Sequence, residues 1–494
     1  MTGDAQVRVC ETVTGSTMGE VRARRDAVTD ADLVEVRLDG VADPDAAGAV
    51  LGSRLPVLVT CRPVWEGGVW DGSEEARARL LLGALSSGAA LVDIEWRAPS
   101  RERLLAAAAA RAVLSLHEFA AVPEDLPATA RAMAACRPCV VKLAVRARRL
   151  GDVVPLLGIG ASLGGSTRLA LVAMGTPGVV TRVAAARFGS AMTYAGPGVE
   201  LGQVPAGRLV HEYGIRRINP ATAVLGLVGR PIAHSVSPAM HNAALQATGL
   251  DAVYVPLEAE SWTDFEALAG ALDIRAASVT APFKREAWQA CRATDDAASR
   301  AGAVNTLRRT DDGVWIGCNT DVEGFLDPLR ARLRPGQRVT VIGAGGAARS
   351  VAMALSAEPV VLTVRARRLA AAREIAGLAG GQAGRLPVPP GSWDVLVNAT
   401  PVGTWPEVTA SPVDPSALTG GLVYDLVYNP AETSLLRAAR SAGCETIGGL
   451  DMLVAQGARQ FTWWTGRPAP DGVMRAAAHR ALDAFREQQG AARG

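Results

Sequence analysis

The chain has 494 residues, with 51 Lys and Arg against 49 Asp and Glu, so its formal net charge is +2 at pH 7. This length corresponds to about two to four domains, and the balanced charge gives no reason to expect a nucleic-acid or membrane-surface protein. No apolar run reaches the ~18 residues of a membrane span, and the first residues lack the pattern of a secretion signal. Seven cysteines are few for this length and odd in number, which indicates a reduced, cytoplasmic protein.

The cysteine and histidine positions predict no metal site. Cys136 and Cys139 form one C-x-x-C pair without a second pair, which is typical of buried thiols. Four histidines show no spacing of metal ligands, namely His211, His234, His241 and His479. We therefore expect no bound metal.

The first 218 residues alternate short Val- and Leu-rich runs with segments of helical spacing, which predicts a parallel sheet with crossover helices. The expected strands are Val7–Cys10, Leu33–Arg37, Pro56–Cys61, Leu91–Glu95, Ala112–Leu116, Cys139–Ala144, Leu169–Ala173 and Ala191–Tyr194. The expected helices include Glu74–Leu85, Arg101–Ala110 and Leu126–Ala135. Eight such units are what a (β/α)8 barrel needs; a doubly wound open sheet is the alternative, which periodicity alone does not exclude.

Polar side chains stand at the ends of several of these runs. They are Glu35, Arg37, Arg62, His117 and Lys142. In a barrel the carboxyl ends of all strands meet at one mouth, whereas an open sheet would spread these residues along an edge. A cluster of this kind favours the barrel.

Lys142 lies inside the apolar run Val140–Ala144, where a lysine is costly unless it reaches water or has a function. An ammonium group in apolar surroundings loses its charge readily, and a neutral amine is the nucleophile that forms imines. His117 ends the preceding run and can act as acid and base near neutral pH. The other charged residues of the set are Glu35, Arg37, Arg62 and Arg182. Together they indicate an imine-forming barrel for an anionic substrate.

Residues 1–215 resemble type I 3-dehydroquinate dehydratase. The matching pieces are Val34–Arg37, Thr60–Arg62, Glu66–Gly68, Asp93–Glu95, Ser115–Phe119, Lys142, Met174–Gly175, Arg182 and Phe188–Ser190. The resemblance implies that Lys142 is the Schiff-base lysine, that His117 is the general base and acid, and that Glu66 orients His117. It implies that the substrate is held by Glu35, Arg37, Arg62, Arg182 and Gln203. The family has Ser-Ala-Pro-Gly-Gln near the end of the barrel, whereas this chain has Val199–Gln203 and lacks the serine.

Two changes of pattern predict further boundaries. Pro205–Pro220 carries Pro, Gly and charge without a strand period, so we place a junction near Asn219–Thr222, before a strand at Ala223–Gly229. A second change comes near Arg334–Gly336. We expect a barrel at residues 1–218, a substrate-binding lobe at 219–330 that is completed by about 458–494, and a dinucleotide-binding Rossmann lobe at 331–457.

The run Arg338–Gly343 predicts a strand that leads into the glycine-rich turn Gly343-Ala-Gly345-Gly346-Ala347. The first glycine permits the tight turn, the second lets the backbone approach a pyrophosphate, and the small residue after them lets the helix pack closely. The helix that follows presents free N–H groups to the phosphates. We expect that helix at Arg349–Ala357 and the next strand at Pro359–Val364.

The end of that next strand predicts the cofactor. An NAD site places Asp or Glu about 20 residues after the turn, to bind the ribose 2′-hydroxyl. Here the segment contains Arg365, Arg367 and Arg368 and no acidic residue. Guanidinium groups bind a 2′-phosphate well, so we predict a preference for NADP over NAD.

A polar constellation comes before the turn. Ser235 and Ser237 can direct two hydroxyls at one polyol or carboxylate, although a serine at that place also suits a helix cap. Thr280 and Lys284, then Asn305, then Asp321 follow apolar runs, as expected of a polar site. A lysine beside a carboxylate can relay a proton to a carbonyl oxygen that is being reduced, while the cofactor supplies the hydride.

Residues 223–480 resemble shikimate dehydrogenase through GRPIAHSVSP, VTAPFK, GAVNTL, NTDVEGF, VIGAGGAARS, VNATPVG, YDLVYNP and GLDMLVAQGARQF. The resemblance implies that Lys284 and Asp321 are the catalytic pair. It implies that shikimate is bound by Ser235, Ser237, Thr280, Asn305, Asp321 and Gln456, with Tyr428 and Gly449 where substrate and nicotinamide meet. It implies an NADP site formed by Gly343, Gly345, Gly346, Ala347, Arg365, Arg368, Asn398 and Thr400. At the ribose-phosphate position the family has Asn-Arg-Thr, whereas this chain has Val364–Ala366. We therefore expect recognition of the 2′-phosphate to depend on Arg367 or Arg368.

The two resemblances together imply a bifunctional shikimate-pathway enzyme, a lyase and an NADP-dependent oxidoreductase. Its partners would be the small molecules 3-dehydroquinate, 3-dehydroshikimate and shikimate, with neither nucleic acid nor a membrane. Two alternatives remain open: the reductase half prefers quinate, or the chain is a non-catalytic sensor of pathway intermediates. A sensor would be expected to lack the reactive residues, whereas Lys142, His117, Lys284 and Asp321 are all present.

Overall fold

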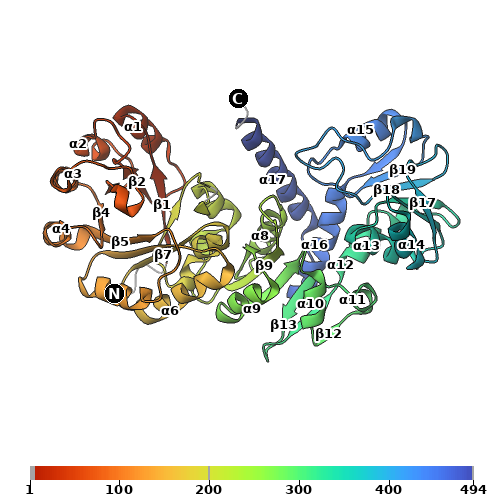
Figure 1. The fold of residues 1–494 in the computed structure, drawn as a ribbon, viewed down its shortest axis with the longest axis horizontal. Coiled ribbons are helices and arrows are strands. Elements are labelled where there is room, and N and C mark those ends of the chain that lie inside the picture. Colours follow the sequence, from red (N-terminus) through yellow and green to blue (C-terminus); the bar gives the residue numbers. More distant parts are fainter. Residues whose placement is uncertain (1–5, 199–200, 492–494) are drawn as a thin grey trace. The chain divides into compact units, whose positions relative to one another are not determined.

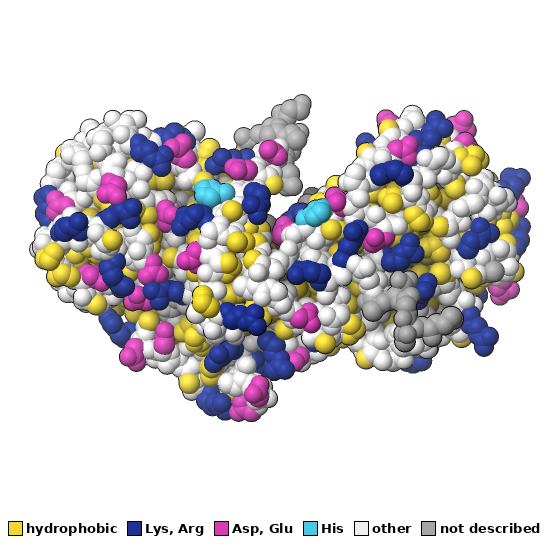
Figure 2. Space-filling model, turned by 180° about the vertical axis from the view of Figure 1, so that it is seen from behind, with side chains coloured by type: hydrophobic (Ala, Val, Ile, Leu, Met, Phe, Trp, Pro, Cys, Tyr) yellow, Lys and Arg dark blue, Asp and Glu magenta, His cyan; other side chains and the backbone are white. Residues whose placement is uncertain are grey.

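The computed structural model describes residues 6–198 and 201–491 (Figure 1). These residues form two compact units: the first comprises the chain up to Ala233 together with Leu250–Arg275, and the second comprises His234–Gly249 together with the chain from Ala276 on. Within the described ranges, no helix combines the length and the apolar character that crossing a membrane requires. On the face shown in Figure 2, basic and acidic side chains are interspersed.

The first part of the chain forms an eight-stranded parallel barrel, as predicted, with strand order β7-β6-β5-β4-β3-β2-β1-β8. The strands are β1 (Arg8–Val13), β2 (Leu33–Arg37), β3 (Val57–Thr60), β4 (Leu91–Glu95), β5 (Ala112–Glu118), β6 (Val140–Arg146), β7 (Leu169–Met174) and β8 (Met192–Ala195). The two end strands of this order, β7 and β8, meet each other: the Ala191 backbone N–H donates to the Leu169 carbonyl oxygen at 2.8 Å, which excludes the open-sheet alternative. The seam between β7 and β8 is joined by a bridge at Leu169 and Ser190, so closure there is nearly complete.

Helices follow most of the barrel strands and lie outside them (Figure 1). They are α1 (Met18–Ala27), α2 (Ala46–Val50), α3 (Glu74–Ser86), α4 (Arg101–Ala108), α5 (Leu126–Ala135), α6 (Val154–Leu163) and α7 (Val179–Val183). Local capping fixes where several of them begin: the side chains of Thr17, Asp45 and Ser73 each accept a backbone N–H from the first turn.

A second sheet has the order β10-β9-β11-β13-β14-β12. Its strands are β9 (Ala223–Gly229), β10 (Ala252–Glu258), β11 (Ile274–Val279), β12 (Ala293–Thr294), β13 (Thr306–Arg309) and β14 (Trp315–Cys318). The helices along this stretch are α8 (Ser237–Ala247), α9 (Trp262–Ala271), α10 (Lys284–Ala290), α11 (Asp296–Ala301) and α12 (Thr320–Leu326). The sheet is mixed, since β13 runs antiparallel to both β11 and β14.

The third sheet is parallel, with the order β17-β16-β15-β18-β19-β20, which is the Rossmann order. Its strands are β15 (Arg338–Ile342), β16 (Val361–Ala366), β17 (Gln382–Arg385), β18 (Val395–Asn398), β19 (Leu422–Asp425) and β20 (Glu445–Ile447). The helices are α13 (Gly346–Leu355), α14 (Leu369–Gly377), α15 (Ser434–Ser441), α16 (Gly449–Thr465) and α17 (Asp471–Ala491). This confirms the predicted dinucleotide-binding fold.

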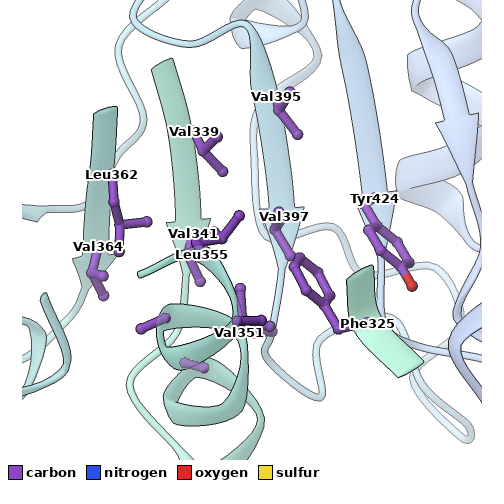
Figure 3. Close-up of a cluster of buried hydrophobic side chains, with 14 of the residues drawn as sticks. Phe325, Val339, Val341, Val351, Leu355, Leu362, Val364, Val395, Val397 and Tyr424 are labelled. Carbon is purple, nitrogen blue, oxygen red and sulfur yellow. The ribbon is translucent and has the colours of Figure 1, made fainter. Parts of the chain in front are cut away.

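The core of this lobe explains why the sheet forms. Alternate residues of β15, β16 and β18 point to one face, where Val341, Val364 and Val397 pack against Val351 of α13 (Figure 3). On the other face, Ile342 of β15 and Leu396 of β18 belong to one buried cluster with leucine side chains of α15. The strand β18 is buried along its whole length and reads as an apolar run, whereas on β16 buried residues alternate with residues that are not fully buried.

The predicted elements differ from the observed ones mainly at their ends. The strand predicted at Pro359–Val364 runs to Ala366, because β16 pairs with β17 up to that residue. Arg365 therefore lies within the strand rather than beyond it. The helix predicted at Arg349–Ala357 begins at Gly346, directly after the turn.

Candidate active sites

The Lys142 amine lies inside the barrel, between two carboxylates. Its Nζ is 3.3 Å from Glu35 Oε1 on β2 and 3.3 Å from Asp93 Oδ2 on β4. The ring of Tyr194, on β8, covers a third side, with its centroid 3.8 Å from Nζ. The expectation of apolar surroundings is wrong: although Val140 and Ala144 share its face of β6, the Lys142 amine reaches charged groups on strands across the barrel.

Glu35 is a fixed anion in this site. Burial by itself raises its pKa, but the charges of Lys142, Arg37 and Arg62 outweigh burial and lower the pKa to about 2. The hydroxyls of Thr12 and Thr60 donate to its two oxygens at 2.7 and 2.8 Å. The carboxylate is therefore held in place as a partner for the amine.

His117, at the end of β5, is held from two directions. Glu66, in the short 3-10 helix Val64–Glu66, accepts the backbone N–H of His117 at 2.7 Å, and its Oε1 lies 3.4 Å from Nδ1. The Arg62 guanidinium lies against the ring nitrogens. Burial and the charges of Arg62, Lys142 and Arg37 hold the pKa of His117 well below its ordinary value. The imidazole is therefore neutral near pH 7 and able to accept a proton.

Two arginines in the barrel lack full partners among the described residues. Arg182 is buried and donates only to the carbonyl oxygens of Tyr194 at 3.1 Å and Leu201 at 3.3 Å, and its Nε has no partner. Burial lowers its pKa to about 10. Arg62 Nη2 lies 3.2 Å from Asp93 Oδ2, while its Nε has no partner. Buried cations of this kind are ready to bind an anion.

Arg37 and Gln203, which were also predicted to bind the substrate, form hydrogen bonds to residues close to them in sequence. Arg37 makes two hydrogen bonds to Asp39, at 2.8 and 2.7 Å, so part of its guanidinium is committed to a neighbour. Gln203 Oε1 accepts the backbone N–H of Gly198 at 2.9 Å and so braces its own loop. Val199, where the family's serine is missing, lies outside the described residues.

A second polar site lies in the other unit. Lys284 is the first residue of α10, and its Nζ is 2.5 Å from Asp321 Oδ2. Asn305 donates its side-chain N–H to the other oxygen of Asp321 at 2.8 Å. Asp321 is placed by Asn319, which caps α12 and accepts the Asp321 backbone N–H at 3.1 Å. The predicted pair is thus in direct contact.

Other predicted residues lie around this pair. Gln456, on α16, has its Oε1 3.5 Å from Asn305 Nδ2. The Ser235 hydroxyl accepts the Ser237 backbone N–H at the start of α8, and Thr280 follows β11. Tyr428 is half-buried, and burial raises its pKa. The substrate contacts of these side chains remain predictions.

The glycine-rich turn has the geometry of a phosphate cradle. Gly343 has φ +120°, and a Cβ there would stand 2.7 Å from the Ala399 carbonyl oxygen, so only glycine fits. Gly345 and Gly346 are exposed, with open space where a Cβ would be. No side chain caps the N-terminus of α13. Its first N–H groups therefore face solvent and can receive phosphate oxygens.

The residues expected near the ribose fall into two groups. Arg367 and Arg368 are exposed between β16 and α14, whereas Arg365 donates to the Arg385 carbonyl oxygen at 2.8 Å. Asn398 uses its side chain within the lobe, donating to Asp425 at 2.9 Å and accepting both the backbone N–H and the hydroxyl of Thr400. Asn398 thus shapes the loop that carries Thr400 beside Gly343.

Three family models match the chain. Type I 3-dehydroquinase covers residues 9–220, the shikimate dehydrogenase substrate binding domain covers 227–307, and the shikimate 5′-dehydrogenase C-terminal domain covers 449–479. A bifunctional 3-dehydroquinate dehydratase/shikimate dehydrogenase of Arabidopsis thaliana is 33% identical over 476 residues, which is 89% of this chain and 78% of that protein. The chain belongs to the bifunctional dehydroquinate dehydratase/shikimate dehydrogenase family.

Single-function relatives match the second half of this bifunctional chain. A shikimate dehydrogenase (NADP(+)) of Moorella thermoacetica is 42% identical over 277 residues, covering 52% of this chain and 93% of that protein. A crystal structure of a shikimate dehydrogenase in complex with NADP+ has a TM-score of 0.51 at 34% identity, covering 53% of this chain and 97% of its own.

Two further residues of the bifunctional enzyme's barrel lie at the candidate site. Asp93 and Tyr194 both contact the Lys142 amine, and neither was assigned a role. Asp93 could have been found, because Leu91, Asp93 and Glu95 alternate on β4 and the latter two are buried carboxylates. Tyr194 carries no such signal, since an aromatic residue in a strand is usually core.

Proposed function

We propose that residues 1–218 dehydrate 3-dehydroquinate to 3-dehydroshikimate and that the rest of the chain reduces this product to shikimate. Residues 219–330, completed by about 458–494, form the lobe that holds the six-membered ring, and residues 331–457 bind NADP. The observation that carries the proposal is the buried Lys142 amine, which lies in one barrel with the neutral His117 imidazole and the incompletely paired Arg182.

In the dehydration, Lys142 Nζ bonds to the ketone carbon of the substrate, and the carbonyl oxygen leaves as water with two of the three ammonium protons, which gives a protonated imine. His117 then removes the C2 proton, and the electron pair passes into the imine. The same imidazole returns a proton to the C1 hydroxyl, which leaves as water. Hydrolysis of the imine releases the product and restores the amine. Arg182 and Arg62 pair with the substrate carboxylate, and Glu35 and Asp93 hold the amine before and after the addition.

In the reduction, Lys284 and Asp321 act at the ketone oxygen. Lys284 Nζ donates a proton to this oxygen as the alcohol forms, and Asp321, 2.5 Å away, holds the lysine and shares its proton. Asn305 keeps the second carboxylate oxygen of Asp321 in place. Ser235, Ser237 and Gln456 bind the substrate's carboxylate and hydroxyls.

The residues of the third sheet fit NADP. The uncapped N-terminus of α13 and the open space at Gly345 and Gly346 accommodate a pyrophosphate. Arg367 and Arg368 are exposed where a 2′-phosphate would lie. When bound, the reduced cofactor supplies the hydride for the ketone carbon.

We place the protein in a reducing compartment, the cytoplasm, because all seven cysteines are free. The name of the Arabidopsis relative assigns that protein to the chloroplast.

The test is to give the purified chain 3-dehydroquinate together with NADPH. We expect NADPH to be oxidised only after 3-dehydroshikimate has formed, and shikimate to accumulate. In the reverse direction we expect shikimate to be oxidised faster than quinate, and NADP to give a higher kcat/KM than NAD. A chain that binds 3-dehydroquinate without converting it would instead be a sensor.

A further inference from the structure

Tyr194 contacts the reactive amine of the barrel. It lies on β8, opposite Cys10 of β1, and only 4% of it is exposed. Its ring faces Lys142 Nζ at 3.8 Å. An ammonium or iminium group is attracted to the face of an aromatic ring, most strongly where water is excluded. The ring therefore stabilises a positive charge at Nζ and keeps the amine between Glu35 and Asp93.

The hydroxyl group of Tyr194 has no hydrogen-bond partner among the described residues, although it is buried. The other hydroxyl groups around the amine are used differently: Thr12 and Thr60 donate to Glu35, and Ser115 donates to Asp93. A buried hydroxyl without a partner destabilises the folded chain, whereas phenylalanine would fill the same space without that cost. The unpaired phenol group thus points to a partner that comes with the substrate.

The position of the phenol oxygen agrees with such a partner. It stands at the rim of the ring whose face contacts Nζ, and therefore close to the amine. Once the amine is bonded to a six-membered ring, the hydroxyl and carboxylate oxygens of that ring lie only a few bonds from Nζ. The Tyr194 hydroxyl is therefore placed to donate a hydrogen bond to one of these oxygens.

We propose that Tyr194 is a specificity-determining residue of the dehydration site. Its ring holds the Lys142 amine, and its hydroxyl hydrogen-bonds an oxygen substituent of the polyhydroxylated ring acid that Lys142 binds. The proposal rests on the proposed function of the barrel, and it adds one substrate contact to those of Arg62 and Arg182.

The test uses the full chain and three variants. Tyr194→Phe removes only the hydroxyl, and Tyr194→Leu removes the ring as well. Tyr424→Phe is the matched control, because Tyr424 also has a buried hydroxyl without a partner among the described residues but lies in the nucleotide lobe, stacked on Phe325 (Figure 3). We measure kcat and KM for 3-dehydroquinate, the thermal unfolding temperature, and the borohydride-trapped adduct by mass spectrometry.

For Tyr194→Phe we expect KM to rise about two- to tenfold, the value of one hydrogen bond, with no loss of thermal stability and with trapping retained at saturating substrate. Tyr194→Leu should be trapped more slowly than Tyr194→Phe, because only phenylalanine restores the ring contact. Tyr424→Phe should leave the dehydration unchanged.

An unchanged kcat/KM in Tyr194→Phe would overturn the substrate contact. A lower unfolding temperature in that variant would also overturn it, since the hydroxyl would then have a partner within the protein. If Tyr194→Leu and wild type were trapped at the same rate, the ring of Tyr194 would have no role in holding the Lys142 amine. A wild-type chain that dehydrates its substrate without any trapped adduct would contradict the proposed function itself, and this proposal with it.

Discussion

Individual residues set the protonation states of the barrel site. His117 is neutral because burial and three nearby cations oppose its charge, and a neutral imidazole is what proton removal needs. Glu66 holds the backbone of this histidine, yet burial raises its own pKa to about 7 despite that hydrogen bond and the charge of Arg62. The carboxyl beside the proposed base therefore titrates close to neutral pH.

The raised pKa of Glu66 predicts a pH-dependent stability. Its ordinary pKa is 4.5, so between about pH 4.5 and 7 the folded state retains a proton that the unfolded state has lost. The contribution of Glu66 to the free energy of unfolding therefore falls as the pH rises from about 4.5 to 7. Glu66→Gln keeps an acceptor for His117 but does not titrate. When the pH is raised from 5 to 8, we expect the free energy of unfolding of the variant to increase by about 1–3 kcal/mol relative to that of wild type.

Urea unfolding followed by fluorescence at both pH values measures this difference. Glu75→Gln is a suitable control, because Glu75 is exposed and also lies in the barrel domain. If the free energies of unfolding of wild type and Glu66→Gln differ by the same amount at both pH values, the pKa of Glu66 is not raised by folding.

Among the strands and helices, the junctions between them carry part of each site, such as His117 near the end of β5 and Lys284 at the start of α10. The glycine turn between β15 and α13 shows how tightly such a junction is specified. Gly343 combines φ +120° with a Cβ position 2.7 Å from a carbonyl oxygen, whereas Gly346, at the start of α13, has open space around it.

This contrast predicts that alanine substitutions at the two positions differ in their effect on stability. Gly343→Ala should destabilise the nucleotide lobe by about 1–3 kcal/mol, because an L-residue is strained there and meets the backbone of Ala399. Gly346→Ala should change stability by no more than about 0.5 kcal/mol. Hydrogen exchange of the β15 and β18 peptides measures both, and equal protection in the two variants would contradict the geometry.

Much of this element structure could be predicted, because hydrophobic periodicity is local information. Leu33–Arg37, Leu91–Glu95 and Leu126–Ala135 agree with the observed elements to the residue. The pairings across the barrel could not be predicted: the sequence placed Glu35 and Lys142 in one cluster, but not the contacts of the amine with Glu35, Asp93 and Tyr194, which come from three other strands. The end of β16 was also missed, because its last pairs form with β17.

In the whole molecule, the two lysines that we propose as catalytic belong to different compact units, and the described contacts of each stay within its own unit. One chain therefore carries two separable chemistries. Lys142→Ala should abolish dehydration, by about 10³-fold or more, and leave the reduction of added 3-dehydroshikimate intact. Lys284→Ala should lower the reduction about 10²- to 10⁴-fold and spare the dehydration.

Separate assays of the two half-reactions on each variant check this independence. Loss of both activities in either single variant, with the fold retained by circular dichroism, would show that the sites depend on each other.

The proposed dehydration depends on a covalent bond between Lys142 and the substrate. The most direct measurement is borohydride reduction in the presence of 3-dehydroquinate, followed by peptide mass spectrometry. We predict an irreversible adduct on the peptide that contains Lys142, loss of dehydratase activity, and no adduct in Lys142→Ala. Continued dehydration by wild type with no adduct at this lysine would contradict the account.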